Sequence, residues 1–345
     1  MEIAFILPSR GRSGGVKATV CAANHLQKRG HNVRLFYKRR ILTARNIYHS
    51  LVFPILYSGN YDWVQEFTGS VKSFTEIKEC LFKKNEIIIG AGMWASNQLI
   101  SLGSISNTKL QYLHGEHIVS PKEREEVLRS TLPKIVVSFF LKPLVESYGG
   151  KVLGVIPNGI NKEEFFNSAG SSDKNGIGGI YASHISKDPG TLLAVLNEIS
   201  RKMPKVPIRM FGPHRRPKNI MIKTFLRLPS VEKAREIYTR SKVWILASRS
   251  EGFGIPILEA MSCDCAVVAT DCGGPRDIIR NGENGFLVEV GNVGEIVDRV
   301  ILLLTDDKLR QNICLKAQET VKKFSWENSI DKMENVLKRL TLKDC

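Results

Sequence analysis

The sequence predicts an α/β protein built from two doubly wound parallel sheets. Short apolar runs rich in strand-forming residues alternate with segments of helical periodicity in both halves of the 345-residue chain, a pattern typical of parallel strands joined by helices. Two stretches rich in small residues, 168–173 and 176–179, separate the halves. We therefore expect Rossmann-like domains at 1–165 and 176–325, facing each other across a cleft, and a terminal helical segment at 326–345.

The first half begins with an expected strand at 3–7, a glycine turn that includes Gly15, and a helix that reaches Leu26. The apolar run 47–57, which Pro54 interrupts, is interpreted as a loop or a helix. The remaining elements follow from apolar runs and helical spacing, with strands at 32–36, 86–90, 109–116, 135–138 and 151–156 and helices at 94–102 and through Leu144.

His114 lies at the end of the expected strand 109–116. The carboxyl end of a parallel strand faces the ligand crevice of an open α/β sheet, so His114 is a candidate site residue. His117 is the competing candidate, and a single histidine is often only structural.

The second half repeats the alternation of strands and helices and closes with a helix. Ile330, Met333, Leu337 and Leu340 form one apolar stripe at helical spacing. The expected elements before this helix are strands at 180–182, 208–212, 243–247 and 286–288 and helices at 191–199 and 231–238.

The segment 243–261 predicts a strand, a glycine loop and a helix. The apolar strand 243–247 is followed by Gly252 and Gly254, which let the backbone approach a ligand closely. Pro256 suits the first helical position because the amide hydrogen that it lacks has no helical acceptor there. Such a loop directs backbone amides and the positive end of the helix at a bound anion, so a phosphate site is expected.

Two carboxylates, Glu251 and Glu259, frame this glycine loop. They would repel a phosphate, but ionised carboxylates accept hydrogen bonds from neighbouring hydroxyl groups. An anion-binding loop between hydroxyl-binding carboxylates indicates a nucleotide sugar. The alternative is that Glu259 is a first-turn acid favoured by the helix dipole and that Glu251 is a loop charge.

The whole segment resembles the retaining GT-B glycosyltransferases of the family 4 type, the glycosyl transferases group 1. The resemblance rests on 250–261, which reads SEGFGIPILEAM, and continues through 266–271, Gly273, Gly274 and 281–285. It implies transfer of a sugar from a nucleoside diphosphate sugar to a glycan or lipid-linked acceptor, with retention of configuration and without a metal or other cofactor. It also implies that the terminal helix crosses back to brace the first domain.

The resemblance assigns roles to individual residues of this chain. Glu259 would hold the ribose hydroxyls, and Glu251 would hold the sugar. Lys187 and the amides of Phe253, Gly254 and Ile255 would stabilise the charge on the leaving diphosphate. Gly15 would lie beneath that diphosphate, and His114 would lie near the anomeric carbon. The expected donor-binding residues are Gly15, His184, Lys187, Gly252, Phe253, Gly254, Ile255 and Glu259, with His114, Glu251 and Lys187 as catalytic residues.

The sequence departs from the family pattern in the loop 181–190. The family carries an arginine there, but this chain has Ser183 or His184 at that place. A bound diphosphate would draw His184 toward its charged form, so His184 is one substitute. The alternatives are an arginine of the run 209–216 or weak activation of the donor.

The net charge of +16 favours an anionic partner. No acidic residue occurs at 3–61 or at 200–231, although both runs are rich in lysine and arginine. An acidic membrane leaflet and a phosphorylated lipid acceptor are the expected partners, whereas no nucleic-acid-binding motif is evident. The alternative is an ordinary solvated basic surface.

Composition also indicates the compartment. The seven cysteines without a secretory signal predict a reducing, cytoplasmic location, with peripheral association at the inner face of a membrane as a further expectation. No apolar run reaches the roughly 20 residues that span a bilayer. Cys263, Cys265 and Cys272 are interpreted as core thiols, because no companion zinc-ligand spacing is present.

Two other functions remain open at this point. The missing arginine raises the possibility of an inactive GT-B subunit that serves as a scaffold or binding module. A nucleotide-sugar epimerase would need paired acid and base groups that the sequence does not reveal. The base, sugar, acceptor and linkage are not specified by the sequence.

Overall fold

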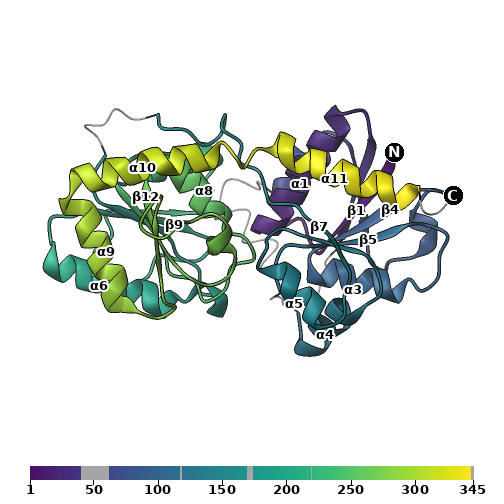
Figure 1. The fold of residues 1–345 in the computed structure, drawn as a ribbon, viewed down its shortest axis with the longest axis horizontal. Coiled ribbons are helices and arrows are strands. Elements are labelled where there is room, and N and C mark those ends of the chain that lie inside the picture. Colours follow the sequence, from purple (N-terminus) through teal and green to yellow (C-terminus); the bar gives the residue numbers. More distant parts are fainter. Residues whose placement is uncertain (40–61, 117–118, 169–173, 219, 343–345) are drawn as a thin grey trace. The chain divides into compact units, whose positions relative to one another are not determined.

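The computed structural model describes residues 1–39, 62–116, 119–168, 174–218 and 220–342 (Figure 1). The predicted features at 47–57 and His117 lie outside these ranges. The chain forms two compact units. Unit 1 contains Met1–Val137, Leu141–Pro157 and Trp326–Cys345, and unit 2 contains Ser138–Phe140 and Asn158–Ser325.

Unit 1 is built on a parallel sheet of seven strands in the order β3-β2-β1-β4-β5-β6-β7. The central strands are almost continuously aliphatic, as expected where helices cover both faces. Residues Ile3 to Leu7 and Ile87 to Ile89 are essentially inaccessible to solvent. In sequence order the strands are β1 (Glu2–Leu7), β2 (Asn32–Lys38), β3 (Ser70–Phe74), β4 (Ile87–Ala91), β5 (Lys109–Leu113), β6 (Lys134–Val136) and β7 (Val152–Val155).

The helices of unit 1 include one from the end of the chain. In α11, Trp326 stacks on His25 of α1, and Ser329 donates to the Pro157 carbonyl at 2.6 Å. Figure 1 shows α11 alongside α1. The helices are α1 (Gly14–Lys28), α3 (Met93–Ser101), α4 (Pro121–Arg129), α5 (Leu141–Ser147) and α11 (Trp326–Thr341), with 3₁₀ turns η1 (Trp63–Glu66) and η2 (Glu79–Leu81).

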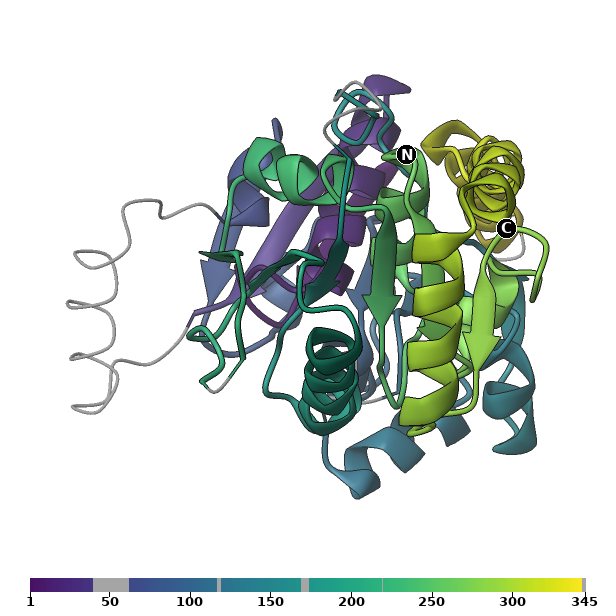
Figure 2. The ribbon, with the colours of Figure 1, turned by 90° about the vertical axis from the view of Figure 1, so that its left-hand side faces the viewer.

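Unit 2 is built on a parallel sheet of six strands in the order β10-β9-β8-β11-β12-β13. Helices α6 and α9 pack side by side over this sheet, and their apolar residues share one core with its strands (Figure 2). The strands are β8 (Ile177–Ile180), β9 (Ile208–Gly212), β10 (Thr224–Arg227), β11 (Val243–Leu246), β12 (Ala266–Thr270) and β13 (Phe286–Val288). The helices are α6 (Pro189–Lys202), α7 (Val231–Thr239), α8 (Ile255–Ser262), α9 (Val293–Thr305) and α10 (Asp307–Val321), with 3₁₀ turns η4 (Ile185–Lys187) and η5 (Gly274–Asp277).

Each sheet has a switch point where the chain order reverses. In unit 2, β8 lies between β9 and β11, and in unit 1, β1 lies between β2 and β4. Ligands of open α/β sheets bind outside the carboxyl ends of the strands at such a point. The two-unit α/β architecture predicted from the sequence is therefore confirmed, and each unit offers one expected ligand position.

The first strand of unit 2 lies earlier than the sequence predicted. We expected a linker at 176–179 and a strand at 180–182, but β8 covers Ile177–Ile180 and includes Gly178 and Gly179. Trp244 explains this, because a Cβ at Gly178 would lie 2.5 Å from its ring. The glycine makes room for a large buried side chain rather than for a flexible linker.

The two units also divide at a different place from the expected linker. The division falls between Pro157 and Asn158. Phe165 already belongs to unit 2, where its ring packs edge-on against Tyr238 at 5.8 Å between centroids. Across the described residues, no helix is long and apolar enough to cross a bilayer.

Candidate functional site

The loop between β11 and α8 of unit 2 leaves a helix N-terminus uncapped by any side chain. Gly254 occupies the N-cap position with φ 100° and ψ 46°, in the left-handed region that favours glycine. The helix begins at Ile255, so Pro256 is its second residue rather than its first. The first amides of α8 therefore have no side-chain acceptor within the loop, which is the arrangement that binds anions.

Gly273 and Gly274 belong to a segment whose backbone packs directly against this loop. Glu251 N–H donates to the Cys272 carbonyl at 3.2 Å, and Gly274 N–H donates to the Glu251 carbonyl at 2.8 Å. A Cβ at Gly274 would lie 2.4 Å from the Phe253 Cα. Any side chain at Gly274 would therefore displace the 252–254 backbone.

Glu251 lies at the carboxyl end of β11 and is only 8% exposed. Its Oε1 accepts hydrogen bonds from Lys187 Nζ at 2.5 Å and from Ser248 Oγ at 2.7 Å. Lys187 comes from the loop after β8, so the two strands at the switch point each supply one member of this ion pair. The structure thus brings two of the predicted residues together and fixes them through Ser248.

An arginine that the sequence analysis missed lies on the same pair of loops. Arg249 Nε contacts Asp188 Oδ2 at 2.8 Å, and the Arg249 amide donates to the Ser186 carbonyl at 2.8 Å. Asp188 is buried and also caps α6 by accepting from the Thr191 amide at 3.2 Å. Arg249 is therefore anchored to Ser186 and Asp188, the residues on either side of Lys187, and its position two residues before Glu251 was the available signal.

The substitutes that the sequence analysis considered for the missing family arginine have different surroundings. His184 is exposed, and its Nδ1 accepts from the Ser186 amide at 3.3 Å and lies 2.7 Å from the Ser186 hydroxyl. Arg209 is buried and donates to the Asn175 carbonyl at 2.7 Å, and Arg216 donates to the Ile222 carbonyl at 2.7 Å. Arg209 and Arg216 thus bind carbonyl groups away from the glycine loop.

Glu259 projects from α8 and is 8% exposed. The hydroxyl of Tyr238, a fully buried residue of α7, donates to Glu259 Oε2 at 2.8 Å. Burial, together with the neighbouring Glu259, raises the pKa of Tyr238 well above its ordinary value, so this hydroxyl keeps its proton. Tyr238 was missed by the sequence analysis, which treated it only as part of a helix.

His114 and Gly15 form a second group at the switch point of unit 1. The Thr19 hydroxyl donates to the Gly15 carbonyl at 2.8 Å and lies 3.1 Å from His114 Nε2. Because that hydroxyl has only one proton, Nε2 must carry the hydrogen of their shared bond. Nδ1 is then an unprotonated, buried acceptor without a hydrogen-bond partner among the described residues. Burial lowers the pKa of His114 to about 3, so its ring is neutral.

The three clustered cysteines behave as core thiols. Cys263 and Cys265 are fully buried, and Cys272 is 7% exposed. Cys265 donates to the Tyr238 carbonyl at 2.9 Å, and burial raises its pKa to about 12. A thiol that keeps its proton and donates to a carbonyl is a poor metal ligand.

Comparison with known proteins places the site in a family. Residues 215–320, which include Glu251 and Glu259, match the family model described as glycosyl transferases group 1. Over these residues the chain is similar to the glycosyl transferases group 1, and its two parallel-sheet units have the architecture of the GT-B fold.

Individual relatives agree with that placement. The chain is 26% identical over 217 residues to the uncharacterized glycosyltransferase MJ1178 of Methanocaldococcus jannaschii, covering 60% of this chain and 59% of that protein. It is 33% identical over 112 residues to N-acetyl-alpha-D-glucosaminyl L-malate synthase of Bacillus anthracis, covering 32% of this chain and 29% of that protein. The chain therefore matches less than two thirds of the length of either relative.

A solved structure extends the likeness in fold to nearly the whole chain. Anabaena HepE, crystallised in complex with UDP, superposes with a TM-score of 0.75 at 16% identity. The superposition covers 98% of this chain and 100% of HepE.

Proposed function

We propose that the protein transfers a sugar from a nucleoside diphosphate sugar to a glycan or lipid-linked acceptor, with retention of configuration. The observation that carries this proposal is the switch point of unit 2. The uncapped N-terminus of α8, the Lys187–Glu251 pair from the loops after β8 and β11, and the buried Glu259 carboxylate of α8 lie there. The family match of 215–320 supports the same reaction class.

Some of these polar groups would bind the diphosphate of such a donor, and the others would bind the hydroxyl groups of its sugar and ribose. The amides at the start of α8, Lys187 and Arg249 would stabilise negative charge on the leaving diphosphate. Lys187 would then exchange its contact with Glu251 for one with the phosphate. This leaves the Glu251 carboxylate to accept from sugar hydroxyl groups, while Tyr238 holds Glu259 for the ribose hydroxyls.

His114 would act as a neutral group in this reaction. Its Nε2–H is engaged with Thr19, so Nδ1 is the nitrogen that remains to accept a hydrogen bond. A neutral acceptor suits a sugar hydroxyl and would contribute little to the charge on a diphosphate. We assign it positioning of the sugar rather than proton transfer, because its pKa of about 3 makes it a weak base.

The first test is a panel of nucleoside diphosphate sugars, beginning with UDP-sugars, with release of nucleoside diphosphate as the readout. We expect at least one donor to be turned over or hydrolysed, and the anomeric configuration of the product to match the donor by proton NMR. A scaffold or binding subunit would show donor binding without release. Inversion of configuration would contradict the retaining mechanism.

The proposal also predicts that turnover survives EDTA. The backbone amides of the α8 N-terminus and the cations Lys187 and Arg249 would together stabilise the charge on the diphosphate, so a divalent metal would not be needed to neutralise it. We expect equal initial rates with and without EDTA in a protein preparation freed of metals. Loss of activity that Mn²⁺ or Mg²⁺ restores would overturn this assignment.

A further inference from the structure

Asp188, which directly follows Lys187, has a backbone conformation that residues other than glycine rarely adopt. Its φ of 40° and ψ of 64° lie in the left-handed region. Aspartate and asparagine enter this region more readily than most residues, because their short side chains bond to the local backbone. Non-glycine residues held there cluster at functional sites, so the conformation of Asp188 directs attention to what its side chain does.

The Asp188 carboxylate is 6% exposed, and both of its oxygens are in use. Oδ1 accepts from the Thr191 amide at 3.2 Å, and Oδ2 accepts from the Thr191 hydroxyl at 2.9 Å. Thr191 lies in the first turn of α6, so these two bonds cap that helix. Oδ2 also lies 2.8 Å from Arg249 Nε, a contact that capping does not require.

The contact with Arg249 joins the two loops at the switch point of unit 2. Lys187 and Asp188 lie on the loop after β8, and Arg249 and Glu251 lie on the loop after β11. The main chain already links these loops, because the Arg249 amide donates to the Ser186 carbonyl at 2.8 Å. Asp188 therefore adds a side-chain contact that fixes one part of the Arg249 guanidinium on the loop that carries Lys187.

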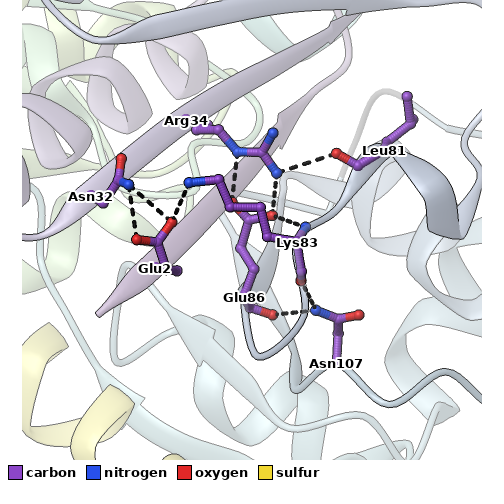
Figure 3. A network of polar contacts seen from close by, with 7 residues as sticks. All are labelled: Glu2, Asn32, Arg34, Leu81, Lys83, Glu86 and Asn107. Atoms are coloured by element: carbon purple, nitrogen blue, oxygen red, sulfur yellow. Dashed lines mark hydrogen bonds and ion pairs between the residues drawn. The ribbon is translucent and has the colours of Figure 1, made fainter.

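The buried pair of Arg34 and Glu86 in unit 1 shows how an ion pair with a purely structural role differs. Arg34 is 7% exposed, and it binds Glu86 through both Nε and Nη2 and the Leu81 carbonyl through Nη2 (Figure 3). The Arg249 side chain is 57% exposed and contacts Asp188 through Nε. Within the part of the chain that the structure describes, its Nη1 and Nη2 groups form no hydrogen bond, so they remain available to a ligand.

We propose that Asp188 is a positioning residue, which holds Arg249 through Nε so that its Nη groups bind the diphosphate of the donor. This inference rests on the proposed function, which places Arg249 at the leaving diphosphate. A guanidinium carries five N–H donors in a rigid fork, so one part can contact a carboxylate while another binds phosphate. A side chain that is fixed before the ligand arrives also loses less conformational freedom on binding.

Two other roles for Asp188 fit the contacts less well. If it served only as the cap of α6, its contact with Arg249 would be incidental. If it masked Arg249 from anions, a two-point pair like that of Arg34 and Glu86 would be the effective arrangement. The contact through Nε instead leaves the outer part of the guanidinium uncovered.

The test is a double-mutant cycle made of Asp188→Asn, Arg249→Ala and the double variant. Asparagine tolerates the left-handed conformation, and its amide can bond to both the amide and the hydroxyl of Thr191. Its NH₂ group, in the place of Oδ2, cannot pair with the Arg249 cation. Asp188→Gly, which also suits this conformation and is tolerated as a cap, replaces Asp188→Asn if thermal melting shows that the latter does not fold.

The matched control is Asp264→Asn, the same substitution at another aspartate of the left-handed region. Asp264 follows the carboxyl end of α8, whereas the proposed anion site lies at the amino end of that helix. The probe is inorganic pyrophosphate, which carries linked phosphates without a base or a sugar. Calorimetric titration measures its affinity for the wild type and for each variant.

We expect Asp188→Asn to weaken pyrophosphate binding about threefold or more beyond its effect in the Arg249→Ala background, within the range of coupling between contacting residues. The loss of one negative charge affects binding similarly in both backgrounds, so the cycle separates that effect from positioning. Asp264→Asn should bind pyrophosphate as the wild type does.

Three results would overturn the inference. Equal fold-changes in the two backgrounds would leave Asp188 as a helix cap, and coupling of the opposite sign would mean that it masks Arg249. The third is a wild type that does not bind pyrophosphate. Release of nucleoside diphosphate is measured separately on the wild type. Its absence with the expected coupling would reject the proposed function alone, whereas its presence with equal fold-changes would reject the role of Asp188 alone.

Discussion

The two switch points of the molecule have the same topology but carry different charges. In unit 2 the position holds an ion pair, Lys187–Glu251, beside an uncapped helix N-terminus. In unit 1 it holds the neutral His114, whose hydrogen is fixed by Thr19. The same fold plan therefore places charged groups at the switch point of one unit and a neutral hydrogen-bond acceptor at that of the other.

Removing Lys187 should produce the largest effect. Lys187→Ala takes away a cation proposed to face the leaving diphosphate, and we expect kcat to fall by about 10²–10³, the range found when one such group is lost. Lys187→Arg keeps the charge and should retain more activity than Lys187→Ala. Steady-state kinetics on folded protein would measure both, and equal loss in both variants would argue for a packing role.

Glu259 should contribute mainly to donor affinity. Glu259→Gln should weaken binding of the nucleoside diphosphate by about 1–3 kcal/mol, the scale of a charged hydrogen bond left unmade. Tyr238→Phe removes only the hydroxyl that orients Glu259, so its effect should be smaller, about 1 kcal/mol. Calorimetry with wild type and both variants checks this order. Unchanged affinity in Glu259→Gln would remove Glu259 from the site.

Arg249 tests whether the missing family arginine is supplied from the next strand. Because its guanidinium is more than half exposed and already pairs with Asp188, we expect Arg249→Ala to lower kcat/KM only about tenfold. His184→Ala provides the matched comparison on the neighbouring loop. A larger loss in His184→Ala than in Arg249→Ala would assign the role to the histidine.

The neutral state of His114 predicts a pH dependence of stability. Its pKa in the folded state, about 3, is lower than its ordinary value near 6.5, so below pH 6.5 the unfolded chain binds a proton that the folded chain does not. Stability should therefore fall with pH between about 6 and 4, by up to about 1.4 kcal/mol per pH unit from this group. Urea unfolding at several pH values should show a shallower fall in His114→Asn. Equal slopes would mean that folding leaves the pKa of His114 unshifted.

The sequence predicted strands best where they are central and aliphatic. Strands β9 and β11 fall at or within one residue of the expected ranges, because continuous apolar runs have little alternative to a buried strand. The edge strands β3 and β10 were missed, since SVKSF and TFLR are short and partly polar. Strand β8 was misplaced because its glycines accommodate Trp244, a packing relation that no local pattern reveals.

The candidate site was predicted as a set of residues but not as a set of contacts. Lys187 and Glu251 were both candidates, yet their ion pair joins residues 64 positions apart and depends on β8 lying beside β11. The prediction of an anionic partner from net charge failed in a different way. It treated every lysine and arginine of a basic run as lying on the surface. Arg34 and Arg209 are buried and bind a carboxylate and carbonyl oxygens.

The division of the chain between the units has a consequence for biosynthesis. Unit 1 needs α11, which packs on α1 and supplies the carboxylates that pair with Arg29, yet α11 is translated after the whole of unit 2. Unit 2 in turn includes Ser138–Phe140, where the Phe139 amide donates to Asp277 at 2.6 Å. The half that leaves the ribosome first is therefore completed last, and neither half can be excised for separate expression as one continuous stretch of codons.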